Sequence, residues 1–324
     1  MTKAITFART GGPDVLEFHD IDLPPPGAGE ARVRHTAIGV NFIDTYHRSG
    51  LYPVTLPSRL GQEAAGIVEA VGTDVRDVQV GDRVAYAMGA LGSYAEASNV
   101  AAARLVKLPN GISDEVAAAS LLKGMTAQYL LTRTYAVCPG ETILFHAAAG
   151  GVGLIACQWA KHLGATVIGT VGSDEKIPMA REAGCDLVLN THTDDWLALV
   201  REFTKGEGVP VIYDSIGKDT FDKSLDCLAV RGMFVSFGSS SGAVPPFAPS
   251  ILASKGSLFL TRPSLAHYTR DHTELQQTAN DLFDVIASGA VKISIGQRFA
   301  LADAADAHRA LESRATTGAT ILIP

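Results

Sequence analysis

A run of small residues, ETILFHAAAGGVG at 141–153, has the composition of a phosphate-binding turn between a strand and a helix. Its last four residues are candidate cofactor contacts: Gly150, Gly151, Val152 and Gly153. The first two glycines would let the backbone turn and approach a pyrophosphate without a clashing Cβ, and the third would let the helix pack closely on the strand. The start of that helix would offer free N–H groups and a partial positive charge to phosphate oxygens. We therefore predict a dinucleotide site, with Ala148 in place of the first glycine of the usual G-x-G-x-x-G pattern.

The segment after the next apolar stretch predicts which dinucleotide binds. An NAD-selective fold usually places an acidic residue about 20 positions after the glycine motif, on the ribose hydroxyls. Here the stretch ends GTVGSDEK, with Gly172 and Ser173 where that carboxylate would stand and Lys176 just beyond them. Small, hydroxyl and basic residues suit a 2′-phosphate, so we predict NADPH, with Arg314 as a second candidate for the phosphate. Asp174 keeps the alternative open, because its carboxylate could face the ribose instead.

These residues need a strand before them and a helix after them, and the chain from about residue 122 supplies both. Predicted strands cover 142–145, 166–170, 187–189, 209–213, 232–237 and 257–261. Predicted helices cover 126–135, 154–163 and 194–203, and two more begin at 173 and 219. This alternation is typical of a parallel sheet with helices on both faces.

Residues 1 to about 120 are predicted to be mostly β. Strand-like stretches at 4–7, 31–37, 66–71 and 83–87 are separated by turns rich in Gly, Asp and Pro, which suggests a barrel-like domain. Residues 113–119 are predicted to start a helix, with Ser113 as its candidate N-cap. The tail predicts helices at 274–288 and 302–313, a strand within 291–299 and a last strand at 319–323. We expect this last strand to pair back into the first domain.

The composition argues against several classes of protein. A chain of 324 residues with 47% hydrophobic residues is long enough for two domains with apolar cores. The net charge of −7 gives no electrostatic reason to expect nucleic acid, and no apolar run reaches the roughly 20 residues that span a bilayer. The N-terminus has no signal-peptide pattern, so a cytoplasmic location is the default prediction. The four cysteines and nine histidines show no metal-ligand spacing.

Eight stretches together carry a family resemblance. They are GVNFIDTYHRSGLY at 39–52, LGQEAAGIVEAVG at 60–72, VGDRVAY at 80–86, LKGMTAQYLL at 122–131, FHAAAGGVGLIACQWAK at 145–161, YDSIG at 213–217, VSFGSSSG at 235–242 and ESRATTG at 312–318. The chain resembles the medium-chain dehydrogenase/reductase superfamily and, within it, the zeta-crystallin-like quinone oxidoreductases. The stretches span most of the chain, so the resemblance covers both predicted domains.

The resemblance implies an α/β fold of two domains. A GroES-like β-barrel catalytic domain would cover 1–124 and 266–324, with a Rossmann domain, a doubly wound parallel sheet, inserted at 125–265. Cofactor and acceptor would bind in the cleft between the domains. The resemblance also implies a homodimer, in which the strand at 257–261 could pair edge to edge with its copy.

The resemblance also bears on metal content. In the zinc alcohol dehydrogenases of the superfamily, a Cys and a His-Glu pair occupy the stretches that match NFIDTY and GQEAAG. This chain has Asp44 near the Cys position and Gln62 where the ligand His would stand, followed by Glu63. A catalytic zinc needs three protein ligands of N, S or O character, and Gln62 is a poor one. We therefore expect no metal, no alcohol oxidation, and reduction of an electron-poor acceptor.

Four residues are expected to do the chemistry. Asn41, Tyr46 and Tyr52 fall in a loop that resembles the active-site wall of the family. The amide could donate to a quinone carbonyl, and the tyrosines could stack on the ring or donate O–H, with core packing as their alternative. Lys123 is expected beside the nicotinamide, where it would hold the cofactor or polarise an acceptor oxygen. Its alternative is an ordinary lysine at a helix end.

Further residues are expected along the cofactor, which Asn41 and Lys123 would also contact. They lie in LKGMTAQYLL or follow strands of the predicted parallel sheet, where such folds bind ligands: Thr126, Tyr129, Ser215, Phe237, Gly238, Ser239, Ser240 and Arg262. Relatives commonly have an Asn-Tyr pair after the third strand of this sheet. Here Thr191 replaces that tyrosine and cannot stack on adenine, so the choice of NADPH over NADH is less secure than the fold. For His146 we favour a packed, hydrogen-bonded side chain over a catalytic one.

The sequence thus predicts an NADPH:quinone oxidoreductase that works without metal. A first alternative is an NADPH-dependent reductase of activated C=C bonds in enals or enones. A second is a nucleotide-binding protein with a structural or RNA-binding role, against which the net charge of −7 counts.

Overall fold

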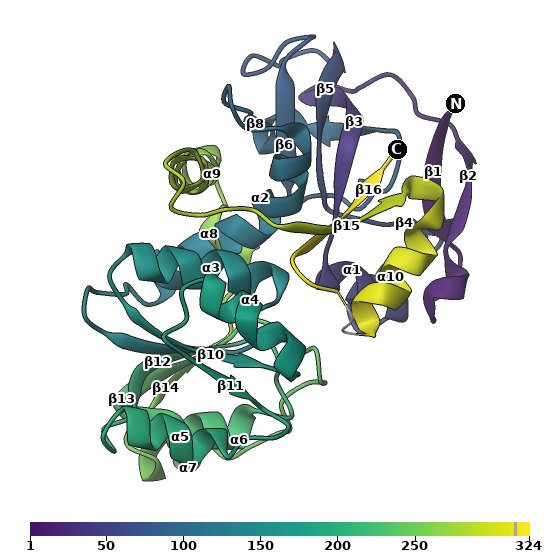
Figure 1. Cartoon of the computed structure of the whole chain (residues 1–324). Coiled ribbons are helices and arrows are strands. Elements are labelled where there is room, and N and C mark those ends of the chain that lie inside the picture. Colours follow the sequence, from purple (N-terminus) through teal and green to yellow (C-terminus); the bar gives the residue numbers. More distant parts are fainter. Residues whose placement is uncertain (314–315) are drawn as a thin grey trace. The chain divides into compact units, whose positions relative to one another are not determined.

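The computed structural model describes residues 1–313 and 316–324, and they form two compact units (Figure 1). Unit 1 comprises Met1–Met125, Thr269–Ala287 and Ile293–Pro324, and unit 2 comprises Thr126–Tyr268 and Ser288–Lys292. The predicted domain bounds stay a prediction. The compact units differ from them at residues 125, 266–268 and 288–292.

Unit 2 is built on a six-stranded parallel sheet in the order β11-β10-β9-β12-β13-β14. The strands are β9 Thr142–Phe145, β10 Thr166–Val171, β11 Leu187–Asn190, β12 Val209–Asp214, β13 Leu228–Ser236 and β14 Phe259–Thr261. The helices between and after them are α3 Gly151–His162, α4 Ile177–Glu182, α5 Trp196–Phe203, α6 Phe221–Cys227, α7 Ser250–Ser254 and α8 Leu265–Tyr268. Helices α3 and α4 lie on one face of the sheet, and α5, α6 and α7 lie on the other (Figure 1). This confirms the predicted doubly wound sheet.

Unit 1 contains two sheets. The three-stranded sheet has the order β2-β1-β4, and the seven-stranded sheet has the order β15-β16-β3-β5-β6-β8, with β7 also paired to β3. The strands are β1 Thr2–Phe7, β2 Glu17–Ile21, β3 Glu30–Val40, β4 Ser58–Arg59, β5 Glu63–Val71, β6 Arg83–Ala87, β7 Ala97–Ala101, β8 Val106–Lys107, β15 Ile295–Ala300 and β16 Ala319–Ile323. The last strand pairs antiparallel with β3, so the expected return of the chain to the first domain is confirmed.

The helices of unit 1 differ most from the prediction. They are α1 Phe42–Ser49, α2 Asp114–Tyr129, α9 His272–Ala287 and α10 Ala304–Glu312. Helices are confirmed at both predicted places, but the predicted break between them is wrong, because α2 runs continuously into the π-helical segment η3 Leu130–Thr134. Nearly every residue from 117 to 131 is buried, so this helix has no polar face whose period would reveal its length. Its predicted start is confirmed, since the backbone N–H of Val116 donates to Ser113 Oγ at 3.2 Å.

The stretch that carries Asn41, Tyr46 and Tyr52 is not a loop throughout. Asn41 is the N-cap of α1, Tyr46 lies on this helix, and Tyr52 follows in a bend. The loop prediction failed because the buried side chains of α1 include Asp44 and Arg48. An amphipathic helix normally buries apolar residues, and this one buries charged ones.

Within the described parts of the chain, no helix is long and apolar enough to cross a membrane.

Candidate functional site

The glycine-rich turn of unit 2 leads from β9 into α3. Gly150 caps the helix with φ −81°, and the positive φ of the turn falls on Ala147 at 54°. A Cβ at Gly150 would lie 3.1 Å from the carbonyl oxygen of Ala147. A side chain at Gly150 would be tight against this carbonyl, and the sharp turn that we attributed to the glycines is made by Ala147. Gly150 has no side chain that could cap α3, so among the described residues no N-cap side chain occupies the first N–H groups of this helix.

Gly153 explains how closely α3 packs on this turn. A Cβ at Gly153 would lie 2.2 Å from Ala147 O and 2.8 Å from the carbonyl carbon of Ala148, closer than any real side chain approaches. Ala148 stands in place of the first glycine, and Gly169 of β10 makes room for its methyl group. A Cβ at Gly169 would lie 2.8 Å from the Cβ of Ala148. The bare helix start and the close backbone packing fit a bound pyrophosphate.

Gly172, Ser173 and Lys176 follow β10, and Lys176 is half-buried. Asp174, the residue that left the choice of cofactor open, accepts a hydrogen bond from Asn190 Nδ2 at 2.8 Å. The same amide accepts the backbone N–H of His192 through Oδ1 at 3.0 Å. The ends of β10 and β11 are thus joined through Asn190.

The candidates after β12 and β13 form one pair of connected loops. A Cβ at Gly238 would lie 2.7 Å from Ser215 O, and the Ser240 N–H donates to the same oxygen at 3.1 Å. Arg262 Nη1 donates to Gly238 O at 2.8 Å and its Nη2 donates to Ser239 Oγ at 3.4 Å. The ring of Phe237 packs on Phe145 with centroids 5.6 Å apart. The structure therefore brings these six predicted residues into one region of unit 2.

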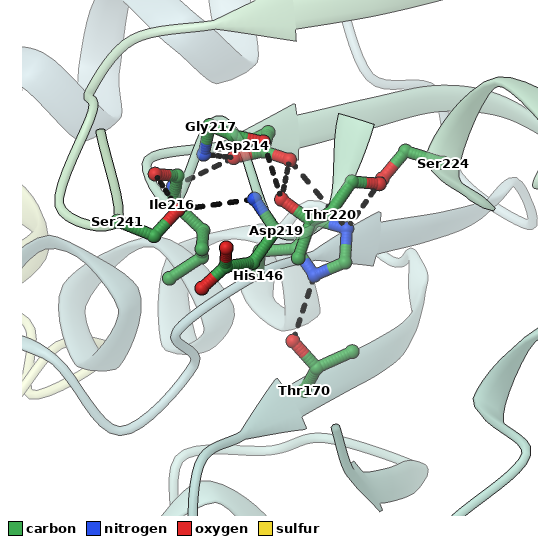
Figure 2. A network of polar contacts seen from close by, with 9 residues as sticks. All are labelled: His146, Thr170, Asp214, Ile216, Gly217, Asp219, Thr220, Ser224 and Ser241. Atoms are coloured by element: carbon green, nitrogen blue, oxygen red, sulfur yellow. Dashed lines mark hydrogen bonds and ion pairs between the residues drawn. The ribbon is translucent and has the colours of Figure 1, made fainter. Parts of the chain in front are cut away.

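A buried polar network holds the strand ends behind these loops (Figure 2). The ring of His146 bonds to Thr170 Oγ1 at 2.8 Å through Nδ1 and to Ser224 Oγ at 2.9 Å through Nε2. Asp214 accepts the N–H groups of Ile216 at 2.6 Å and Gly217 at 2.9 Å, which shapes the turn after Ser215. Burial lowers the pKa of His146, so the imidazole is neutral. His146 is therefore a hydrogen-bonded structural residue, as we favoured.

Thr126 and Tyr129 lie on α2, and Val152 lies in the first turn of α3. Tyr129 stacks on Tyr268 with centroids 4.4 Å apart and an interplanar angle of 12°. Arg133 lies over the other ring of this pair, 5.1 Å from the centroid of Tyr268. The sequence reasoning missed Tyr268, because it lies at the end of a four-residue helix with no motif around it.

In unit 1, Asn41, Glu63 and Lys123 meet in a buried cluster. The carboxylate of Glu63 accepts Asn41 Nδ2 at 2.7 Å, Lys123 Nζ at 3.3 Å and the backbone N–H of Leu122 at 2.6 Å. The Glu63 side chain is fully buried and that of Lys123 is 7% exposed. Lys123 is thus a mid-helix residue of α2 paired with a carboxylate, and the helix-end alternative is wrong.

The two candidate tyrosines pack against each other. The rings of Tyr46 and Tyr52 meet edge to face with centroids 5.2 Å apart, and the Tyr52 N–H donates to Tyr46 O at 3.0 Å. Tyr46 also packs on Phe42 at 5.8 Å. Both tyrosines therefore lie on or beside the helix that Asn41 caps. Arg314, the second candidate for the 2′-phosphate, lies outside the described residues.

The residues at the zinc positions of the superfamily do not fit a zinc ion. Gln62 Nε2 donates to Gly89 O at 3.1 Å, and Glu63 is occupied by three donors, including a lysine. Asp44 Oδ2 accepts the Asn41 N–H and the Tyr94 hydroxyl, each at 2.9 Å. Throughout the described ranges, no three His, Cys, Asp or Glu side chains converge as metal ligands would. The donor set of a zinc site is not formed.

A chain of polar residues beyond Asp44 was missed entirely. Tyr94 OH contacts His308 Nε2 at 3.1 Å, and His308 Nδ1 contacts Arg48 Nη1 at 3.0 Å. Arg48 also holds Glu312 through two hydrogen bonds, at 2.5 and 3.2 Å. These residues come from segments up to 264 positions apart, so no local spacing could reveal them.

Two domain-family models match the chain. The alcohol dehydrogenase GroES-like domain matches residues 27–110, and the zinc-binding dehydrogenase model matches residues 151–288. The first match lies in unit 1, and the second lies mostly in unit 2.

Relatives that match over the full length of the chain show a more specific similarity than the two domain models. A quinone oxidoreductase of Pseudomonas aeruginosa is 55% identical, with all of both chains covered. The crystal structure of Escherichia coli quinone oxidoreductase complexed with NADPH is 52% identical, with a TM-score of 0.98 over 99% of this chain and 100% of that one. A 2-haloacrylate reductase from a Burkholderia species is 46% identical over 100% of this chain and 99% of its own.

Proposed function

Because the chain belongs to the quinone oxidoreductase family of the medium-chain dehydrogenase/reductase superfamily, we propose that it is an oxidoreductase that reduces quinones with NADPH and without a metal ion. The observation that carries the proposal is the buried cluster of Asn41, Glu63 and Lys123. It puts an amide and a compensated cation around Glu63, the residue that follows Gln62 at the ligand-His position of the zinc enzymes.

The residues of unit 2 that would hold NADPH divide into three groups. The pyrophosphate would lie on the start of α3, where Gly150 and Gly153 remove any Cβ from the approach. The ribose phosphate would lie at the end of β10. The remaining contacts would come from the loops after β12 and β13 and from α2, through Ser215, Phe237, Gly238, Ser239, Ser240, Arg262, Thr126 and Tyr129.

The end of β10 favours a phosphate over a bare ribose hydroxyl. The carboxylate of Asp174 already accepts from Asn190, which favours Ser173 and Lys176 as the groups that meet the 2′ position. We expect Lys176→Ala to weaken NADPH binding by roughly 1.5–3 kcal/mol, because a charge-assisted hydrogen bond is lost. KM for NADPH and for NADH in both proteins measures the effect. Lys205→Ala, at an exposed lysine before β12, is the matched control.

An unchanged ratio of the two KM values in Lys176→Ala would show that Lys176 does not meet the 2′-phosphate. The control should leave both KM values unchanged.

The acceptor site would be formed in unit 1. Bound NADPH supplies the two electrons, so a quinone, NADPH and one proton from solution give a hydroquinone and NADP⁺. Asn41 and Lys123 would hold and polarise an acceptor oxygen, and the edge-to-face pair of Tyr46 and Tyr52 would provide an apolar wall. The carboxylate of Glu63 fixes the direction of the Asn41 amide, because Nδ2 must be the atom that faces it.

The test is a steady-state assay with small quinones. We expect NADPH to be oxidised by 1,4-benzoquinone at the same rate before and after dialysis against EDTA, because no step needs a Lewis acid. Absorbance of NADPH follows the reaction. Loss of activity on EDTA treatment that added zinc restores would refute metal-free reduction.

A second candidate function is reduction of an activated C=C bond. The relative that favours it is the 46% identical 2-haloacrylate reductase, whose substrate carries a C=C bond conjugated to a carboxylate. The same NADPH contacts would serve both reactions, so a panel of quinones, enals, enones and haloacrylates separates them by kcat/KM.

Two further expectations remain predictions. The first is a homodimer formed through β14, the edge strand of the unit 2 sheet, on which Phe259 is 57% exposed. The second is a cytoplasmic location.

A further inference from the structure

A chain of hydrogen bonds in unit 1 joins Glu312 of α10 to Asp44 of α1. It runs from Glu312 through Arg48, His308 and Tyr94 to Asp44 Oδ2, with contacts of 2.5 to 3.1 Å along the closest path. Arg48 is 2% exposed, and Tyr94, Asp44 and His308 are fully buried. The catalytic proposal uses none of these four residues.

The direction of every hydrogen bond in this chain is fixed. A guanidinium has no acceptor, so Arg48 donates and His308 Nδ1 accepts. Burial and the charge of Arg48 lower the pKa of His308 to about 3, so the ring is neutral and its single proton is on Nε2. His308 therefore donates to the Tyr94 oxygen, and the Tyr94 hydroxyl donates to Asp44. From Arg48 onward the donors point toward the carboxylate of Asp44, and Arg48 also donates in the opposite direction to Glu312.

Among the buried ionisable groups around Asn41, Asp44 has no ion-pair partner of its own in the described part of the chain. Arg48 of α1 is paired with Glu312 of α10, and Lys123 of α2 is paired with Glu63 of β5. Tyr94 and His308 contribute neutral dipoles. An ionised Asp44 would thus leave a net charge of about −1 buried beside Asn41, a cost that burial in low dielectric makes large.

The two oxygens of Asp44 have different surroundings. Oδ2 accepts from the Asn41 backbone and from Tyr94. Oδ1 is buried and has no hydrogen-bond partner among the described residues. Oδ1 is therefore the atom that would carry a proton, and the carboxyl could become neutral without breaking the two bonds to Oδ2.

We propose that Asp44 is a positioning residue whose neutral form supports reduction at the Asn41–Glu63–Lys123 cluster and whose ionised form opposes it. The inference rests on the proposed function. Hydride addition to a quinone places negative charge on the acceptor oxygen, which Asn41 and Lys123 would stabilise. A second buried anion, joined to Asn41 through its backbone N–H, disfavours that charge.

Burial raises the pKa of Asp44 to about 7, against the hydrogen bonds from Asn41 and Tyr94 and the charge of Lys123. The kcat of the wild type should therefore fall as the pH rises through neutrality. Asp44→Asn keeps both acceptor bonds and cannot ionise, so its kcat should not show this fall. Tyr94→Phe removes one donor to the anion, so its fall should move to higher pH by about one to two units.

The test is the pH profile of kcat for NADPH oxidation by 1,4-benzoquinone in the wild type and the two variants. Tyr86→Phe is the matched control, because it also deletes a buried tyrosine hydroxyl, one that contacts His35 at 2.9 Å, and it should keep the wild-type profile. Urea unfolding at several pH values supplies a second measurement. The raised pKa removes stability from the wild type as the pH rises from 3.8 to about 7, and Asp44→Asn should lack that loss.

The inference is overturned if wild type and Asp44→Asn turn over with the same pH profile, even if the unfolding data show that Asp44 titrates. It is also overturned if Tyr94→Phe and Tyr86→Phe behave alike. A wild-type protein that oxidises no NADPH with any quinone at any pH overturns the proposed function itself, and with it the role of Asp44.

Discussion

Gly153→Ala is expected to raise KM for NADPH on the order of 100-fold, because it displaces the phosphate-binding turn by a fraction of an ångström to an ångström. The added Cβ would lie 2.2 Å from Ala147 O and 2.8 Å from Ala148 C. Both contacts are with backbone, so no side-chain rotation can relieve them, and either α3 or the turn must move. The start of α3 would then no longer meet the pyrophosphate. Steady-state kinetics with NADPH as the varied substrate measures the effect.

Gly12→Ala is the control for this prediction. Gly12 has φ −69°, and a Cβ there would meet no atom within 4 Å. It should leave KM and the unfolding midpoint unchanged, whereas Gly153→Ala should also lower stability by about 1–3 kcal/mol through overpacking. Wild-type affinity for NADPH in Gly153→Ala would mean that the pyrophosphate does not lie on this turn.

The sequence predicted unit 2 well because its signals are local. Each strand there is a short apolar run, and β9 and the last strand of unit 1, β16, have the predicted bounds. The candidate residues sit directly after strands, so a correct strand order also places Ser215, Gly238 and Arg262 in one region. The residue that makes the turn was misassigned, since a positive φ at Ala147 leaves no trace in composition.

The sequence predicted the main strands of unit 1 but not the buried polar contacts of α1. The helix α1 buries Asp44 and Arg48, and the reason lies in residues far along the chain: Tyr94, His308 and Glu312. Polar side chains that stabilise each other across more than 200 positions have no periodicity, so a reading of local pattern assigns them to the surface. Asn41 and Lys123 were found through the family resemblance, and their shared carboxylate, Glu63, explains why they lie together.

The carboxylate of Glu63 is also the basis of the second prediction with a large effect, which concerns the stability of the protein. Glu63→Gln is expected to destabilise the protein by about 3–5 kcal/mol, because it leaves Lys123 buried without its counter-ion. Lys123→Met should cost a similar amount, since it leaves Glu63 as the uncompensated charge. Urea unfolding at neutral pH measures both. Lys3→Met, which breaks the exposed pair with Asp20, should cost less than about 1 kcal/mol and serves as the control.

The double variant Glu63→Gln/Lys123→Met separates stability from function. Without either charge neither position 63 nor position 123 holds an uncompensated ion, so most of the lost stability should return. Activity should not return, because the double variant still lacks the cation that would polarise the acceptor oxygen, a loss of on the order of 100-fold in kcat. If the double variant recovers both stability and kcat, the ion pair is a folding element alone and the acceptor is polarised by other groups. If it recovers neither, the hydrogen bonds of Glu63 to Asn41 and Leu122 outweigh the pairing with Lys123.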